Sequence, residues 1–526
     1  MKRLPLICTA LFLFSAIISG QYYQTGQDPG SLKWMQIKTG SFRVIYPRSF
    51  GTAGAEFARS LDESLSRLGL LYPRSGFRLP VIIHNYTTES NGYVAWAPSR
   101  MEIYPTPEQN AIPLDPNTQL TLHELTHVLQ MESLNKGFTK ALSYLAGQQV
   151  PGAVSSMLPL WFLEGDAVFS ESILSNSGRG RDPSFQKELK AITIDKGRMY
   201  KYDKMINGSF RDFVPDYYQT GFQIMAWSYL KYDRGLWKNA LRFTADDPFT
   251  LNPVNLSLQR SAHLTKKRLF NQTFDTLRTI WDSDNARSES ESYVMLNPED
   301  QKGYVNYYSP LIAGDDSIIA VRTSLSRSPV LVLITPSTKS EKKIFQPGYG
   351  YPWYLSYSKG RIVWVEFRSD PRWQNRSWSV IKVYDMKSHV SRQISHRTRY
   401  MSAAISPDGR FISAAENSVG NSNSLVILNS ADGSVAERIR VPENAYLQRP
   451  AWDETSRTVT CITLSGKGEG VITYDFLKKS WITRIEPGNN NIQSVYLRND
   501  SLFFISSASG TDNIYLQKPD RSIVPL

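Results

Sequence analysis

Apolar and polar positions over the first hundred residues predict a mixed α/β unit. Residues 41–46 alternate as in a half-buried strand, and residues 79–84 form a second apolar strand that ends at His84, a residue expected to be structural. Residues 53–70 carry helical spacing, with apolar side chains at Phe57, Leu61, Leu65 and Leu68. We therefore expect residues 21–115 to be the N-terminal α/β part of a larger domain.

Residues 116–285 are predicted to be mostly helical and to complete this domain. Asp115 and Pro116 are typical of a helix cap followed by a first-turn proline. The next helix is apolar on most sides, which predicts burial, through Leu120, Leu122, Leu125, Val128 and Leu129. Further on, residues 146–159 contain two glycines and two prolines, which predicts a loop between helices.

Past a polar linker at residues 286–302, the pattern changes to short strands and turns. Residues 303–526 contain repeats of about 45 residues, centred on residues 317–321, 361–365, 410–414, 458–462 and 501–505. A turn precedes each centre and a further strand follows it, as in the four-stranded blades of a β-propeller. A β-sandwich is the alternative. Five blades are few, so we expect a small or incomplete ring.

One repeat is distinctive. The segment Ser406-Pro407-Asp408-Gly409-Arg410-Phe411 resembles the TolB-like propeller repeat. Such a propeller is expected to bind a substrate, a protein partner or a glycan. The segment Asp370-Pro371-Arg372-Trp373, with Trp378, is an insertion in the second repeat. It is a binding loop, an arm toward the N-terminal domain or an ordinary blade decoration.

The first twenty residues predict export. Met1-Lys2-Arg3, an apolar run and Ser19-Gly20 are typical of a secretory signal peptide cleaved after Gly20. Cys461 is then the one remaining cysteine, so we expect no internal disulfide. Export without disulfides indicates the periplasm, the cell surface or the medium of a bacterium. No later apolar stretch reaches transmembrane length, so none is expected in the mature chain.

The charge does not indicate a nucleic-acid partner. The formal net charge is +12 over 526 residues. The longest basic cluster, Lys266-Lys267-Arg268, lies on a predicted helix, where it is typical of a solvated face.

The segment His123-Glu124-Leu125-Thr126-His127 carries the candidate chemistry. The chain has six histidines, and these two are four residues apart, so on a helix they share one face and can bind one metal ion. Glu124 beside them can take a proton from a metal-bound water. Glu164, in Trp161-Phe162-Leu163-Glu164-Gly165-Asp166-Ala167, is the predicted third ligand. Three protein ligands and an open position are typical of catalytic zinc.

These two segments resemble the gluzincin metallopeptidases, and more narrowly the peptidase-MA-like branch and the zinc aminopeptidases. The resemblance implies one zinc ion bound by His123, His127 and Glu164, with Glu124 as the general base. The interval from His127 to Glu164 is 36 residues, longer than in the aminopeptidases. A longer loop costs little free energy, so the assignment stands.

Two other segments follow the same resemblance. Tyr218, in Tyr218-Gln219-Thr220-Gly221, is similar to the aminopeptidase tyrosine that stabilises the oxyanion, with Tyr217 as the competing assignment and packing as the alternative for both. Residues 92–98 lead into residues 101–104 and occupy the place of the edge strand that pairs with substrate in gluzincins. The aminopeptidase Gly-x-Met-Glu-Asn signature is missing, which favours an endopeptidase or another amide-bond hydrolase.

Several assignments stay open. Glu171, two turns after Glu164, either orients a ligand histidine or is an ordinary surface residue. Thr126 and Gln130 either support the ligands or face solvent, and Asp166 is given no role. The prediction is an exported zinc metallopeptidase with a propeller for substrate or partner binding. The rival is a propeller-based binding or scaffold protein with a vestigial metallopeptidase domain.

Overall fold

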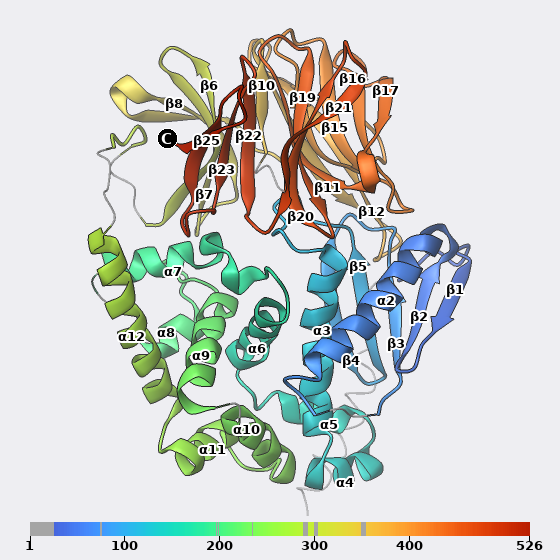
Figure 1. Cartoon of the computed structure of the whole chain (residues 1–526), viewed down its shortest axis with the longest axis vertical. Helices are drawn as coiled ribbons and strands as arrows, with labels where there is room; N and C mark the ends of the chain where they lie inside the picture. Colours follow the sequence, from blue (N-terminus) through green and yellow to red (C-terminus); the bar gives the residue numbers. More distant parts are fainter. Residues whose placement is uncertain are drawn as a thin grey trace, which may run out of the picture.

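In this computed structural model, a helical N-terminal part is followed by a five-bladed β-propeller (Figure 1). The structure describes residues 26–73, 76–195, 197, 199–233, 235–287, 293–298, 303–348 and 354–526. The predicted signal peptide, residues 1–20, and most of the predicted linker lie outside the described residues. Within the described ranges, no helix combines the length and the apolar character that crossing a membrane requires.

A five-stranded mixed sheet opens the described chain. Its strands are β1 (Trp34–Lys38), β2 (Phe42–Pro47), β3 (Leu79–Ile83), β4 (Ser90–Trp96) and β5 (Ser99–Pro105), in the spatial order β1-β2-β3-β5-β4. β2, β3 and β5 are parallel, whereas β4 pairs antiparallel with β5 and forms an edge. The strands predicted near residues 41–46 and 79–84 are β2 and β3, and the predicted edge strand is β4.

The sheet packs against two helices, α2 (Gly51–Leu68) and α3 (Pro116–Leu134). The apolar positions that predicted α2 are mostly buried: Phe57, Leu61 and Leu68 are fully inaccessible, while Leu65 is partly buried. Burying each large apolar side chain contributes about 1.5–3 kcal/mol. This packing fixes the orientation of α3, which carries the two candidate ligand histidines.

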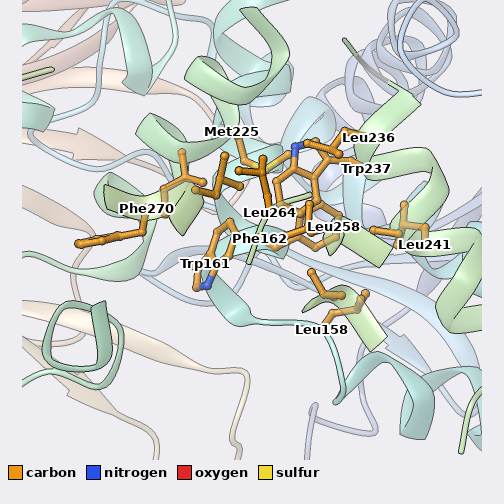
Figure 2. Packing of buried hydrophobic residues seen from close by; sticks show 14 of the residues in the cluster. Leu158, Trp161, Phe162, Met225, Leu236, Trp237, Leu241, Leu258, Leu264 and Phe270 are labelled. Atoms are coloured by element: carbon orange, nitrogen blue, oxygen red, sulfur yellow. The ribbon is translucent and has the colours of Figure 1, made fainter. Parts of the chain in front are cut away.

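The other helices form a second lobe beside α3 (Figure 1). They are α4 (Gly137–Ala146), α5 (Gln149–Ser155), α6 (Leu160–Ile173), α7 (Pro183–Asp195), α8 (Tyr202–Asn207), α9 (Tyr217–Tyr232), α10 (Gly235–Asp246), α11 (Pro253–Ala262) and α12 (Lys266–Arg287). Trp161 and Phe162 of α6 pack on Trp237 of α10, with ring centroids 5.8 and 4.8 Å apart (Figure 2). This aromatic core holds the start of α6, and with it Glu164, in place.

The predicted loop at residues 146–159 was wrong, because this stretch contains α5. Val154 and Leu158, four residues apart, are buried in the core of the helical lobe. Pro151 lies in the first turn of α5, where a missing N–H breaks no helical hydrogen bond. Gly152 lies beside Trp96 of the edge strand. Pro151 therefore belongs to the first turn of a helix here, and Gly152 belongs to the face of that helix next to Trp96.

Five four-stranded antiparallel sheets make up the propeller, so the alternative of a β-sandwich was wrong. Their strands in chain order are β6 (Val305–Gly314), β7 (Ser317–Ser324), β8 (Val330–Thr335) and β9 (Ser340–Phe345); β10 (Ser356–Ser358), β11 (Arg361–Ser369), β12 (Ser377–Asp385) and β13 (Val390–Gln393); β14 (Tyr400–Ile405), β15 (Phe411–Asn417), β16 (Asn423–Asn429) and β17 (Val435–Arg440); β18 (Tyr446–Trp452), β19 (Thr458–Ser465), β20 (Gly468–Asp475) and β21 (Ser480–Gly488); and β22 (Ile492–Arg498), β23 (Ser501–Ser506), β24 (Asn513–Gln517) and β25 (Ile523–Pro525). The five predicted repeat centres fall on the second strand of each blade.

The propeller contacts both lobes of the N-terminal part. On the α/β side, Arg399 donates to the Thr87 carbonyl at 2.6 Å and to the Thr106 hydroxyl at 2.8 Å. On the helical side, Asp512 accepts from Ser184 at 2.8 Å and pairs with Lys187 at 3.1 Å. Of the three roles open for the insertion at residues 370–373, the structure supports an arm toward the N-terminal part, because Trp373 forms a β-bridge with Gly26 and the Gln374 N–H donates to the Gly26 carbonyl at 2.8 Å.

His84 is buried where this arm meets the sheet, as expected for a structural residue. Its Nδ1 lies 3.0 Å from Asp28 Oδ2 and its Nε2 lies 3.0 Å from Glu102 Oε2. Asn375 of the arm donates to Asp28 at 3.0 Å. Burial disfavours the charged imidazole, but the hydrogen bonds to the two carboxylates outweigh it and raise the pKa of His84. A charged His84 therefore helps to hold the propeller against the sheet.

We expect the stabilising effect of His84 to fall as the pH rises. Because its pKa in the folded protein lies above 6.5, the stabilisation is complete below pH 6.5 and is lost as the pH passes the folded-state value. The urea midpoints of the wild type and His84→Gln should differ more at pH 6 than at pH 9. Equal differences at both pH values would contradict a role for the ionised imidazole.

Candidate metal centre

The His-Glu-x-x-His segment lies on α3, whose start is set by the predicted cap. Asp115 Oδ2 accepts from the Thr118 N–H at 2.8 Å, and Pro116 is the first helical residue. One turn separates His123 from His127, and their ring centroids are 5.0 Å apart. Both histidines line one cleft between the two lobes.

Glu164, on α6, completes a convergent group with the two histidines. Its Oε2 lies 3.2 Å from His123 Nε2 and 3.3 Å from His127 Nε2. Burial disfavours the carboxylate, but the hydrogen bonds from the histidines outweigh it and lower the pKa of Glu164. The same contacts raise the pKa of His127 to about 9 despite its burial. The three predicted ligands are thus brought together and could hold a metal ion.

A buried polar chain supports His127 from behind. Gln130 Oε1 lies 3.0 Å from His127 Nδ1, while Gln130 Nε2 donates to Asp166 at 3.0 Å. Asp166 also accepts from Tyr229, at 2.9 Å, and from Tyr72. Gln130 is therefore a support for the ligand and not a solvent-facing residue. Asp166, which had no predicted role, anchors that support from the side of α6 opposite the cleft.

Glu171 and Arg179 support His123. Glu171 is fully buried, with Oε2 3.4 Å from His123 Nδ1. Arg179 donates to both carboxylate oxygens, at 2.8 and 3.0 Å, and its Nη2 lies 2.8 Å from His123 Nδ1. Burial favours the neutral acid, but the charge of Arg179 outweighs it and lowers the pKa of Glu171 to about 2. The alternative of a surface Glu171 was therefore wrong.

Arg179 was not found from the sequence. It lies in a short 3-10 turn, Arg179–Arg181, that follows α6 after Gly178, whose φ is +102°. A turn has no periodicity, so nothing in the spacing of its residues connects it to the ligand helix. Thr126, the other open residue, is buried and donates to the Leu122 carbonyl at 2.8 Å within α3.

Glu124 is buried against the edge strand β4. Burial raises its pKa, because the charged form loses its hydration. Its Oε2 accepts no hydrogen bond from the described residues. Gly92 of β4 allows this placement, since a Cβ there would lie 2.7 Å from Glu124 Cγ. Glu124 thus keeps one buried oxygen available to accept a proton in the cleft.

Tyr218 lies at the start of α9, next to the ligand group. Its ring stacks on His123 at a centroid distance of 6.1 Å, and Arg179 Cζ lies 5.3 Å from the same ring. Burial and the charge of Glu164 raise the pKa of Tyr218, so its hydroxyl keeps its proton. Tyr218 lines the cleft, whereas Tyr217 packs against the core of the helical lobe.

Two glycines bring these elements together. Gly165 follows Glu164 on α6, and Gly221 is one turn from Tyr218 on α9. A Cβ on Gly165 would lie 2.3 Å from the Gly221 carbonyl carbon, and a Cβ on Gly221 would lie 2.0 Å from the Trp161 carbonyl oxygen. The helices α6 and α9 therefore cross with their backbones in contact, which places Tyr218 over the ligands.

The cleft has a volume of about 690 Å³. Residues 90–94 of the edge strand line one side, and Arg179 lines the other together with Asp182, Ser184 and Phe185. Residues 107–112 form the end nearest the propeller, where the Ala111 N–H donates to Gln448 Oε1 at 3.2 Å. An extended chain can lie along β4 in this space, close to Glu124.

Comparison with known proteins finds remote structural likenesses only. No protein-family model and no curated protein matches the sequence. TolB from Acinetobacter baumannii aligns with 14% identity over 40% of this chain and 52% of that chain, at a TM-score of 0.32. An acylaminoacyl peptidase from Pyrococcus horikoshii aligns with 14% identity over 42% and 38%, at 0.31, and the tricorn protease with 12% over 42% and 26%, at 0.30.

The chain thus spans about half the length of TolB and less of the two peptidases. At these TM-scores, no conclusion about activity rests on the likenesses. The strand pairing itself identifies the five-bladed propeller.

We expect Gly221→Ala to lower the free energy of unfolding by about 1–3 kcal/mol, because the added methyl group overpacks the α6–α9 crossing. Gly152→Ala is the matched control on a helix. A Cβ there meets only Trp96, at 3.6 Å. That change should be neutral or stabilise by about 0.5–1 kcal/mol. Urea unfolding of both variants measures the difference, and equal effects would contradict close contact at Gly221.

Proposed function

We propose that this chain is an exported zinc-dependent peptidase of gluzincin type. One observation carries the proposal: three ligand atoms converge beside a buried carboxylate that has a free oxygen. Ligands about 2.0–2.1 Å from a tetrahedral zinc ion lie about 3.3 Å apart. Glu164 Oε2 lies 3.2 and 3.3 Å from the two histidine nitrogens. His123, His127 and Glu164 would therefore hold the zinc ion.

Bound zinc would polarise the scissile carbonyl and lower the pKa of its water. Glu124 takes the proton of the attacking water and passes it to the leaving amine. Its buried position supports both roles, because a raised pKa brings a carboxyl group closer to the pH at which it must accept and release a proton. Gly92 keeps the edge strand, and hence the substrate backbone, in contact with Glu124.

Tyr218 donates a hydrogen bond to the oxygen on which negative charge develops. Its raised pKa keeps the donor protonated at neutral pH. Arg179 acts as a positioning residue, since it holds Glu171 and lies against His123. The buried chain from Gln130 to Asp166 does the same for His127. Such outer partners keep ligand rings in one orientation.

The substrate class we infer is an extended peptide. Edge strands bind extended chains through main-chain hydrogen bonds, and β4 lines the cleft with a free edge. The missing aminopeptidase signature favours cleavage within a chain. A protein without catalysis, in which the propeller alone binds a partner, is the other candidate. This candidate predicts that a change of Glu124 leaves the activity of the protein, which is partner binding by the propeller, unaffected.

The two glutamates should separate by role. Glu124→Gln should keep about one zinc ion per chain but lose hydrolysis, because no base remains. The matched Glu164→Gln should lose most of the zinc, since two histidines alone bind weakly. Metal analysis and cleavage of a quenched peptide library, with and without chelator, measure both effects. A Glu124→Gln variant as active as the wild type would favour the binding-protein candidate.

The two tyrosines provide a second test. Tyr218→Phe should retain zinc and fold normally but lower kcat about 10²-fold or more, as loss of an oxyanion donor does. Tyr217→Phe removes the neighbouring hydroxyl, which lies outside the cleft lining, and should change kcat less than about threefold. Single-turnover cleavage isolates the chemical step. Equal losses in the two variants would remove Tyr218 from the mechanism.

A further inference from the structure

The propeller encloses a channel that adjoins the cleft. Its volume is about 1300 Å³, and the first strand of every blade contributes to its wall. Asn110 lines both the channel and the cleft, and Lys187 of α7 lines the same end of the channel. A chain lying in the cleft therefore has a path from the metal centre into the propeller.

The charge of the channel is of one sign. Its charged lining residues within the described part of the chain are Lys187, Lys359 and Arg449, with no aspartate or glutamate among them. Lys187 is paired with Asp512 at 3.1 Å, which leaves the other two cations as the main source of positive potential. Like charges on a low-dielectric wall raise the local concentration of opposite charge.

Arg449 is held at the mouth of the channel by polar contacts and not by an ion pair. Its Nε donates to the Gln109 carbonyl at 3.2 Å, and its Nη2 donates to Tyr354 Oη at 2.8 Å. Its Cζ lies 4.3 Å from the Tyr354 ring centroid. The remaining nitrogen, Nη1, donates to none of the described residues. A fixed guanidinium with a free edge is suited to bind a carboxylate.

The backbone conformation of Arg449 and the state of the acidic residues around it are consistent with binding of a carboxylate by its guanidinium. Arg449 has φ +48°, in the left-handed region, and lies in a break of register between β18 and β19 that directs it away from the ladder. Glu469, close enough to interact with it, is buried, and burial raises its pKa to about 8, so it is largely uncharged at neutral pH. Glu108 lines the cleft and not the channel.

We propose that the channel mouth at Arg449 binds an acidic segment of the peptide whose scissile bond lies in the cleft. This inference rests on the proposed peptidase function and assigns it a substrate class: peptides with aspartate or glutamate beyond the cleavage site. Carboxylates of the segment pair with Arg449 and then with Lys359 farther along the channel, and the tyrosines of the wall pack on its backbone.

Binding of the acidic segment alone tests the channel apart from catalysis. Fluorescein-labelled hexaglutamate, about 20 Å long when extended, should bind the full-length protein about tenfold more tightly than labelled hexaglutamine. Fluorescence anisotropy measures both affinities, and the difference should shrink at high salt. Arg449→Gln should abolish most of the preference, and Arg449→Lys should retain much of it. The matched Arg457→Gln, at an exposed arginine of the same blade, should keep it.

Cleavage then tests the link to the metal centre. The substrates are quenched peptides that share one core and carry either a glutamate or a glutamine segment, placed at the N-terminal or the C-terminal end of the core. At one of the two ends, the peptide with glutamate should be cleaved with a kcat/KM about tenfold higher than the peptide with glutamine. Arg449→Gln should remove that ratio. No preference in binding or cleavage would overturn this inference and leave the peptidase proposal intact. Hexaglutamate binding that depends on Arg449, without cleavage of any peptide, would overturn the peptidase proposal and leave only the binding of acidic segments at the channel mouth.

Discussion

The backbone contact between Gly165 and Gly221 is the constraint on which the candidate site depends. It lets α6 and α9 approach until a single methyl group would not fit between them. Glu164 and Tyr218 each lie within one turn of this contact, so the crossing sets their separation directly. Trp237 of α10 ties the same two helices together, because its ring packs on Trp161 of α6 and its Nε1 donates to Ser228 of α9 at 2.7 Å. The relative positions of Glu164 and Tyr218 are thus determined by helix packing.

A second level of organisation comes from the propeller, which joins the two lobes that form the cleft. Arg399 reaches the α/β lobe, and Asp512 reaches the helical lobe. Movement of one lobe against the other would break hydrogen bonds at one of these contacts. The propeller therefore acts as a brace that limits how far the cleft opens. These contacts join polar residues that are far apart in the sequence, so sequence patterns do not predict them.

The sequence predicted correctly those features that depend on interactions between residues close together in the chain. The Asp115 cap, the facing histidines on α3 and the second strand of each blade all follow from spacing along a few residues. The helix α5 was missed because burial of Val154 and Leu158 outweighs the usual meaning of nearby glycine and proline. The roles of three residues were missed for a different reason: Arg179, Asp166 and Gly92. Each role depends on contacts with an element distant in the sequence, and the spacing of apolar and polar residues does not predict such contacts.

The order of strands in the propeller has a mechanical consequence. Each sheet consists of four consecutive strands, and among the described strands no hydrogen-bonded ladder joins the first blade to the fifth. The same holds at the other boundaries between described blades, so neighbouring blades are joined by side chains and not by ladders, as where Trp452 of the fourth blade donates to the Ala404 carbonyl of the third at 3.0 Å. Shifting one blade against the next breaks no ladder hydrogen bond, whereas deforming any single blade breaks several. The bore of the ring is thus its most compliant dimension, while the wall of each blade stays stiff.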